Sequence, residues 1–191
     1  MSSNKDPKKI NYSFAKTVAS ESGLDLFSCY QCRKCTNGCP VTFAMDYYPH
    51  QIIRMVQLGF IDEINSSKSI WLCSACETCF TRCPNQIDIP KLMDYLKHRC
   101  LAHGKKPAEI PTASFHEAFL SNIKRFGRAN ETILMIDYHL KTARREKRIQ
   151  FQNILNIFRL GLKLLKKGRL SLLPLNFKRN RNRAINRLFG S

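Results

Sequence analysis

Residues 29–40 read CYQCRKCTNGCP, which is a C-x-x-C-x-x-C-x-x-x-C-P pattern. Residues 73–84 read CSACETCFTRCP and repeat this pattern, so that every cysteine and the proline recur at a constant offset of 44 residues. A pattern that returns at a fixed interval is typical of an internal duplication. Eight of the nine cysteines in the 191-residue chain therefore belong to two copies of one unit.

The spacing of these cysteines predicts two iron–sulfur clusters. A [4Fe–4S] cubane needs four thiolates, and a curled C-x-x-C-x-x-C loop supplies three of them while it turns its backbone amides toward the cluster sulfides. The cysteine before the proline ligates the other cluster, because a residue that precedes proline is pushed out of the helical region and the chain then leaves its own loop. We therefore predict one cluster on Cys29, Cys32, Cys35 and Cys83, and the other on Cys73, Cys76, Cys79 and Cys39.

Two structural zinc sites are the alternative for the same cysteines. Zinc sites usually draw paired C-x-x-C elements from separated segments, whereas here four cysteines lie within eleven residues before a proline, so iron–sulfur ligation is favoured.

The ninth cysteine, Cys100, lies on the apolar face of a predicted helix and is expected to be a buried structural thiol. The histidines form no close pair of metal-ligand type and are expected at the surface or at helix caps: His50, His98, His103, His116 and His139.

Patterns around the two motifs predict the first helices. We expect helices over residues 12–27, from Pro49 to Gly59 and from Pro90 to Gly104. Proline is favoured in the first turn of a helix, and glycine is favoured just after its last turn.

Further helices are expected in the second half of the chain. Phe115, Phe119 and Ile123 recur every fourth residue, and Asn130 is a good N-cap for another helix. Residues 151–167 show the clearest pattern, with apolar residues on one face and arginine and lysine elsewhere.

Strand signals are scarce, so the predicted fold class is all-α. The 33 residues between Cys39 and Cys73 leave room for a full helix and turn, whereas a short β-rich ferredoxin would need little more than a hairpin there. We expect an α-helical ferredoxin module with duplicated cluster loops related by a pseudo-twofold axis. The expected parts are an N-terminal helical segment at residues 1–27, the dicluster domain at 28–104 and a basic helical extension at 105–191.

The net charge of +18 is unevenly placed, with +4 on residues 1–110 and +14 on residues 111–191. We expect the basic half to dock an acidic partner or a membrane surface. Nucleic acid is a less favoured partner, because aromatic residues are not interleaved with the Arg-Asn run at residues 178–187.

The chain shows neither a secretory signal nor a long uninterrupted apolar run, and clustered cysteines suit a reducing compartment, so a cytoplasmic location is expected.

The two motifs differ in charge, since Arg33 and Lys34 lie in the first and Glu77 in the second. Positive charge favours the reduced form of a cluster, and one hypothesis therefore gives the first-motif cluster the higher potential. The alternative is that these charges are solvated and screened, with little influence on either potential.

Three further segments, besides the two cysteine motifs, are informative about the family that the chain resembles. Residues 160–174 read LGLKLLKKGRLSLLP, residues 49–54 read PHQIIR, and residues 70–73 read IWLC. With the duplicated motif, these segments resemble the iron–sulfur C subunit of heterodisulfide reductase, from about Phe27 to Pro174. The motif alone also resembles succinate dehydrogenase-type iron–sulfur subunits and glycolate oxidase-like proteins.

This resemblance implies that the chain relays electrons from the flavin and iron–sulfur A subunit of such a reductase to its B subunit, whose CCG domains cleave a disulfide. The substrate stays open between the coenzyme M–coenzyme B disulfide and another acceptor, because the basic tail from residue 178 departs from the family pattern. No Ser-His-Asp spacing, glycine-rich phosphate loop or nucleotide motif accompanies the cysteines, so the chain is not expected to be an enzyme on its own.

Overall fold

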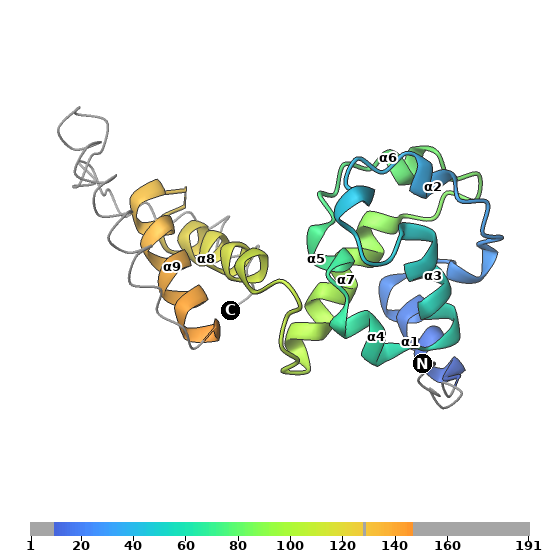
Figure 1. Cartoon of the computed structure of the whole chain (residues 1–191), viewed down its shortest axis with the longest axis horizontal. Coiled ribbons are helices and arrows are strands. Elements are labelled where there is room, and N and C mark those ends of the chain that lie inside the picture. The colour runs from blue at the N-terminus through green and yellow to red at the C-terminus, as the bar shows by residue number, and fades with distance from the viewer. Residues whose placement is uncertain (1–9, 128, 147–191) are drawn as a thin grey trace, which may run out of the picture. The chain divides into compact units, whose positions relative to one another are not determined.

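The computed structural model describes residues 10–127 and 129–146, and the chain divides into two compact units, Met1–Glu109 (unit 1) and Ile110–Ser191 (unit 2) (Figure 1). The described residues contain helices and no strand, which confirms the all-α prediction. The predicted helix at 151–167 and the basic run at 178–187 lie outside the described residues.

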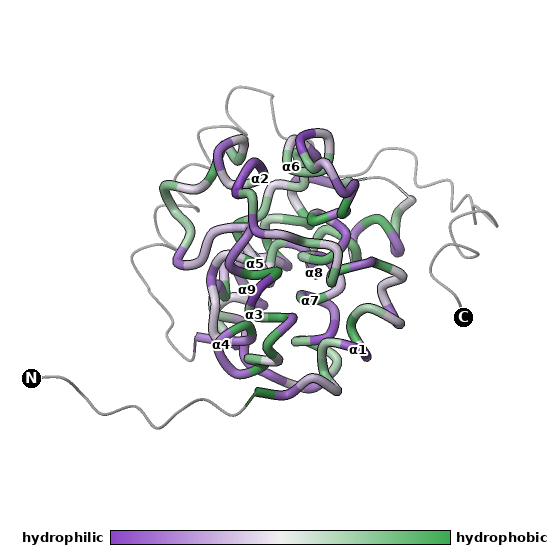
Figure 2. Tube along the Cα trace, turned by 90° about the vertical axis from the view of Figure 1, so that its right-hand side faces the viewer, coloured by the Kyte–Doolittle hydropathy of each residue, from purple (hydrophilic) through white to green (hydrophobic). Residues whose placement is uncertain are grey.

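Unit 1 contains four longer helices, three four-residue helices and two 3-10 turns within its described part. They are α1 (Tyr12–Ser22), η1 (Leu26–Ser28), α2 (Lys34–Asn37), η2 (Thr42–Ala44), α3 (Pro49–Leu58), α4 (Ile61–Ser66), α5 (Ser69–Leu72), α6 (Thr78–Thr81) and α7 (Ile89–Ala102). Helix α1 packs on α3, while α7 contacts α1, α4 and α5. Figures 1 and 2 both show α2 beside α6 at one end of this unit, and these helices are in contact.

The first helix is shorter than the predicted span of residues 12–27. Helix α1 begins after Asn11, whose side chain accepts a hydrogen bond from the Phe14 amide at 3.2 Å. It ends at Ser22 because Gly23 takes the left-handed conformation, with φ of 66°. Asp25 then caps the separate turn η1.

Helices α3 and α7 confirm the predictions made from proline and glycine. Pro49 lies in the first turn of α3, and Gly59 ends that helix with φ of 76°. Asp88 caps α7 by accepting a hydrogen bond from the Lys91 amide at 2.9 Å. The predicted apolar face of α7 is buried in the core of unit 1: Ile89, Leu92, Met93, Leu96 and Cys100.

Gly59 lies so close to the backbone of Asn11 that we expect no larger residue to fit there without a loss of stability. An added Cβ would overlap the backbone of Asn11 and would sit at a positive φ. We expect Gly59→Ala to lower the free energy of unfolding by about 3 kcal/mol, because the strain of the left-handed residue adds to the steric clash. Gly104→Ala is the matched control, since Gly104 also has a positive φ but has nothing within 4 Å of an added Cβ. Urea denaturation should show a loss of about 1 kcal/mol for the control, and equal losses for both variants would contradict the prediction.

Unit 2 contains α8 (Ile110–Phe126) and α9 (Glu131–Glu146), which pack against each other. The predicted N-cap is confirmed, since the Asn130 side chain accepts from the Ile133 amide at 3.2 Å. The every-fourth-residue pattern located α8 but not its buried face. Phe115 and Phe119 are 43% and 38% exposed, and the buried residues of α8 are Ala113, Ser114, Ala118 and Asn122.

None of the helices in the described ranges combines the length and apolar character that crossing a bilayer requires.

Candidate iron–sulfur site

The two motif loops share an uncommon backbone conformation at equivalent positions. Gln31 and Arg33 have φ of 62° and 64°, and Ala75 and Glu77, 44 residues later, have φ of 50° and 59°. Each left-handed non-glycine residue costs about 1 to 2 kcal/mol and persists where surrounding structure enforces it. Alternation of right- and left-handed residues turns successive backbone N–H groups toward one concavity, which suits an anionic sulfur cluster.

A pocket in unit 1 gathers the cysteines that the sequence assigns to the second cluster. Its walls include Cys39 together with Cys73, Cys76 and Cys79. The remaining wall is mainly apolar and comes from the segment after Cys39 and the start of α7: Val41, Met45, Pro49, Ile89, Pro90 and Met93. The cysteine that leaves the first motif therefore lies with the second motif, as crossed ligation requires, although the ligation itself stays a prediction.

A hydrogen bond connects the end of the second motif with the start of the first. The side chain of Asn85 donates it to the Ser28 carbonyl, next to Cys29. Desolvation raises the pKa of the Tyr30 hydroxyl, and the charges of Cys32, Cys83 and Cys29 raise it further. The residue two positions after Cys83 is thus held at the residue before Cys29.

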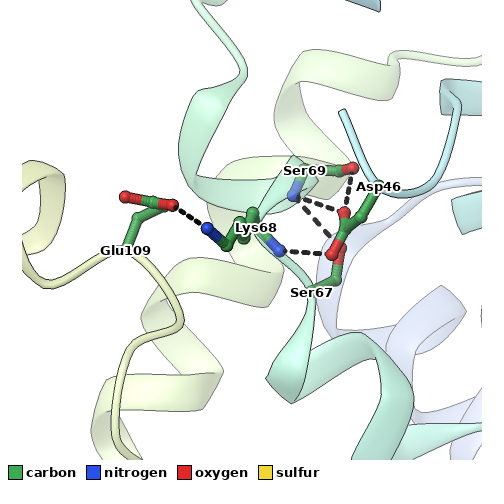
Figure 3. A network of polar contacts seen from close by, with 5 residues as sticks. All are labelled: Asp46, Ser67, Lys68, Ser69 and Glu109. Carbon is green, nitrogen blue, oxygen red and sulfur yellow. Dashed lines mark hydrogen bonds and ion pairs between the residues drawn. The ribbon is translucent and has the colours of Figure 1, made fainter. Parts of the chain in front are cut away.

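Asp46 connects the chain after the first motif with the chain before the second motif (Figure 3). Its carboxylate accepts from the Ser67 hydroxyl at 2.8 Å, the Lys68 amide at 2.8 Å, and the Ser69 amide and hydroxyl at 3.0 and 2.5 Å. These donors lie at the start of α5, the helix that leads directly into Cys73. Asp46 therefore joins the segment that follows Cys39 to the segment that precedes Cys73.

The charge on Asp46 is stabilised by these contacts. Burial opposes its ionisation, but hydrogen bonds from Ser69, Lys68 and Ser67 outweigh burial and hold the pKa of Asp46 below its usual range. The Lys68 ammonium forms an ion pair with Glu109 at 3.0 Å (Figure 3). The carboxylate of Asp46 thus remains charged at neutral pH and caps the start of α5.

The motif thiols have unequal proton affinities. Burial raises the pKa of Cys35 and Cys73, and burial together with Cys73 raises the pKa of Cys79 to about 12. Hydrogen bonding with the side chain and backbone of Thr78 lowers the pKa of the exposed Cys76. Since metal ligands are thiolates, loading these sites must release protons from the buried cysteines.

The cysteine arrangement suits an iron–sulfur cluster. Cys39, Cys73, Cys76 and Cys79 line one pocket. Zinc requires its ligands at about 2.3 Å from one point, whereas a cubane places each thiolate at a separate iron corner. The donor set of four thiols in a mainly apolar pocket therefore fits a [4Fe–4S] cube.

His50 and Thr36 form a contact that the sequence did not indicate. The Thr36 hydroxyl and the His50 Nδ1 lie 2.7 Å apart, and Thr36 directly follows Cys35. His50, expected at the surface or at a cap, is half-buried against the first motif. Burial lowers its pKa, and the charge of Arg33 lowers it further. No sequence pattern pairs positions 36 and 50, although a histidine in the first turn of α3 could have suggested a contact to a loop.

A known family matches the part of the chain that carries this geometry. Residues 25–87 match the family described as "4Fe-4S dicluster domain". This segment is therefore similar to 4Fe–4S dicluster domains. The match indicates two [4Fe–4S] clusters and covers all eight motif cysteines.

Curated relatives confirm the resemblance over part of the chain. The chain is 39% identical over 77 residues to the iron-sulfur C subunit of the CoB–CoM heterodisulfide reductase of Methanopyrus kandleri, covering 40% of this chain and 38% of that protein. It is 32% identical over 107 residues to the C subunit of the H2:CoB–CoM heterodisulfide, ferredoxin reductase of Methanothermobacter thermautotrophicus, covering 56% and 58%. The chain therefore spans about half the length of these relatives, or less.

Proposed function

We propose that the chain is an electron-transfer subunit that relays single electrons through two [4Fe–4S] clusters. It would connect a flavin and iron–sulfur subunit with a disulfide-reducing CCG-domain subunit in a heterodisulfide reductase-like complex. The relatives support a place in such a complex, because they are named as C subunits of heterodisulfide reductases. The observation that carries the proposal is the pocket in which Cys39 joins Cys73, Cys76 and Cys79 within the dicluster domain.

The residues of the chain have three tasks in this function. Cys29, Cys32, Cys35 and Cys83 would hold one cluster, and Cys73, Cys76, Cys79 and Cys39 the other, each cluster accepting and releasing one electron. The apolar wall of the pocket at the second motif limits water around the sulfurs, which helps to set the potential. The contact between α2 and α6 keeps the two motifs together, so that an electron has a short path between them.

The location and the division of the chain belong to the same proposal. We place the chain in the cytoplasm, with the dicluster domain at residues 28–104 between the segment at 1–27 and the basic extension at 105–191. The extension would dock an acidic partner or a membrane surface. The higher potential of the first-motif cluster remains a hypothesis for a redox titration.

The test is the composition and reducibility of the chain purified without oxygen. We expect about eight irons and eight sulfides per chain, since each cubane contributes four of each, and electron paramagnetic resonance signals of two reduced clusters after dithionite addition. Copurification with flavin-containing and CCG-containing subunits would support the named partners. Zinc in place of iron, or far fewer than eight irons after reconstitution, would overturn the proposal.

A further inference from the structure

The duplicated loops present different charges at equivalent positions. Arg33 and Lys34 of the first motif correspond, at the offset of 44, to Glu77 and Thr78 of the second. Arg33, Lys34 and Glu77 are exposed, and none of them forms an ion pair with another described residue. Since Arg33 and Glu77 share the left-handed backbone, the two loops have a similar backbone conformation but opposite charge.

A third cation reaches the first motif from the second. A Cβ added at Gly38 would lie 2.7 Å from the Cδ and 2.9 Å from the Nε of Arg82, so this side chain packs against the end of α2. Arg82 is exposed although its stem makes this contact. Arg33 and Lys34 therefore lie at the start of α2, and Arg82 lies at its end.

Two exposed aromatic residues lie close in sequence to Arg33 and Lys34. Tyr30 is 61% exposed within the first motif, and Phe27 is 53% exposed two residues before Cys29. Aromatic and arginine side chains are enriched where protein partners bind. We define the basic loop surface as Phe27, Tyr30, Arg33, Lys34 and Arg82.

We propose that the basic loop surface docks an acidic electron-transfer protein at the first motif. This inference rests on the proposed function and assigns one of its partners to a specific face. Charge complementarity would steer the partner to the first motif, whereas Glu77 in the second loop would repel it. The duplication would thereby give a single chain two chemically distinct exchange sites.

The number of cations favours a protein partner. Anionic membranes are recognised by clusters of about four to eight lysines and arginines, and sequence-independent binding to DNA commonly uses about six to ten phosphate contacts. The basic loop surface has three cations, which suits an acidic patch on a folded protein.

The test uses the cluster-loaded full chain and a reduced, acidic plant-type [2Fe–2S] ferredoxin as the probe. In anaerobic stopped-flow mixing, one electron leaves the ferredoxin, which is oxidised, and reduces the chain without bond or proton transfer. We expect the second-order rate constant to fall at least about tenfold in the variant Arg33→Glu/Lys34→Glu/Arg82→Glu at low ionic strength. Added salt should slow the unsubstituted chain and have little effect on the variant.

The matched control is Lys105→Glu/Lys106→Glu, two exposed lysines that follow α7, the helix that runs away from the loops (Figure 1). Its rate should stay within about twofold of the unsubstituted chain.

Dithionite must reduce every variant by the same number of electrons, and failure of this reduction in the unsubstituted chain would refute the proposed function instead. Equal rates for the triple variant and the unsubstituted chain, or a rate for the unsubstituted chain that does not depend on salt, would overturn the docking proposal. A variant that loses binding only to anionic lipid vesicles would also overturn it.

Discussion

Replacing Cys39 with alanine is expected to remove the cluster of the second motif, although Cys39 belongs to the first motif in sequence. The reason is that Cys39 lines one pocket with Cys73, Cys76 and Cys79. Iron analysis should fall from about eight to about four per chain. The remaining paramagnetic signal should match that of Cys76→Ala and differ from that of Cys32→Ala.

Two outcomes bear on this prediction. Cys100→Ala is the control, because Cys100 is buried on α7 and does not line the pocket, so its iron content should be unchanged. A Cys39→Ala spectrum that matches Cys32→Ala would show that each motif ligates its own cluster, which would contradict crossed ligation.

Replacing Asp46 with alanine should destabilise unit 1 more than any other single acidic substitution in it. Its carboxylate accepts hydrogen bonds from the Ser67 hydroxyl, the Lys68 amide, and both the amide and hydroxyl of Ser69. Removing a charged acceptor leaves several donors without their partner, which costs about 3 kcal/mol. Urea denaturation of the iron-free chain measures this loss, and iron analysis should show reduced loading of the second cluster in particular.

Two further substitutions separate the role of Asp46 from a general loss of charge. Asp46→Asn keeps the size and one acceptor oxygen, so we expect a smaller loss of about 1 to 2 kcal/mol. Asp62→Ala removes an exposed acid from α4 and should cost less than about 1 kcal/mol. Similar losses for Asp46→Ala and Asp62→Ala would contradict the role of Asp46 as a tie between segments.

The same contacts predict how stability depends on pH. The folded-state pKa of Asp46 is depressed, so its contribution is fully present above the unfolded pKa of about 3.9 and is lost as pH falls through the lower folded value. The difference in unfolding free energy between the unsubstituted chain and Asp46→Ala should therefore shrink below about pH 4.

The helical class could be predicted from the sequence because the residues that begin and end a helix act locally. Pro49 and Gly59 mark both ends of α3, and the apolar spacing of α7 matches its buried face. The predicted helix at residues 12–27 is too long, because Gly23 takes the left-handed conformation and ends α1 at Ser22.

Features that depend on long-range packing could not be predicted. Asp46 meets residues more than 20 positions away, and no periodicity indicates that pairing. On α8, the exposed Phe115 and Phe119 gave the stronger pattern, while Ala113 and Ala118 fill the buried face, since close helix packing favours small side chains. The crossed ligation of the two clusters stays a prediction from the cysteine spacing, which the pocket shared by Cys39 and the second motif supports.

The reciprocal ties from Asp46 to α5 and from Asn85 to Ser28 join the two halves of the repeat. Under the predicted crossed ligation, each half would complete the cluster of the other half, so a peptide with one motif would be complete only as a symmetric dimer. Joining the two halves in one chain makes their encounter intramolecular, with a high effective concentration of the second half. Within one chain the two halves are free to differ, and positions 33 and 77 carry opposite charges.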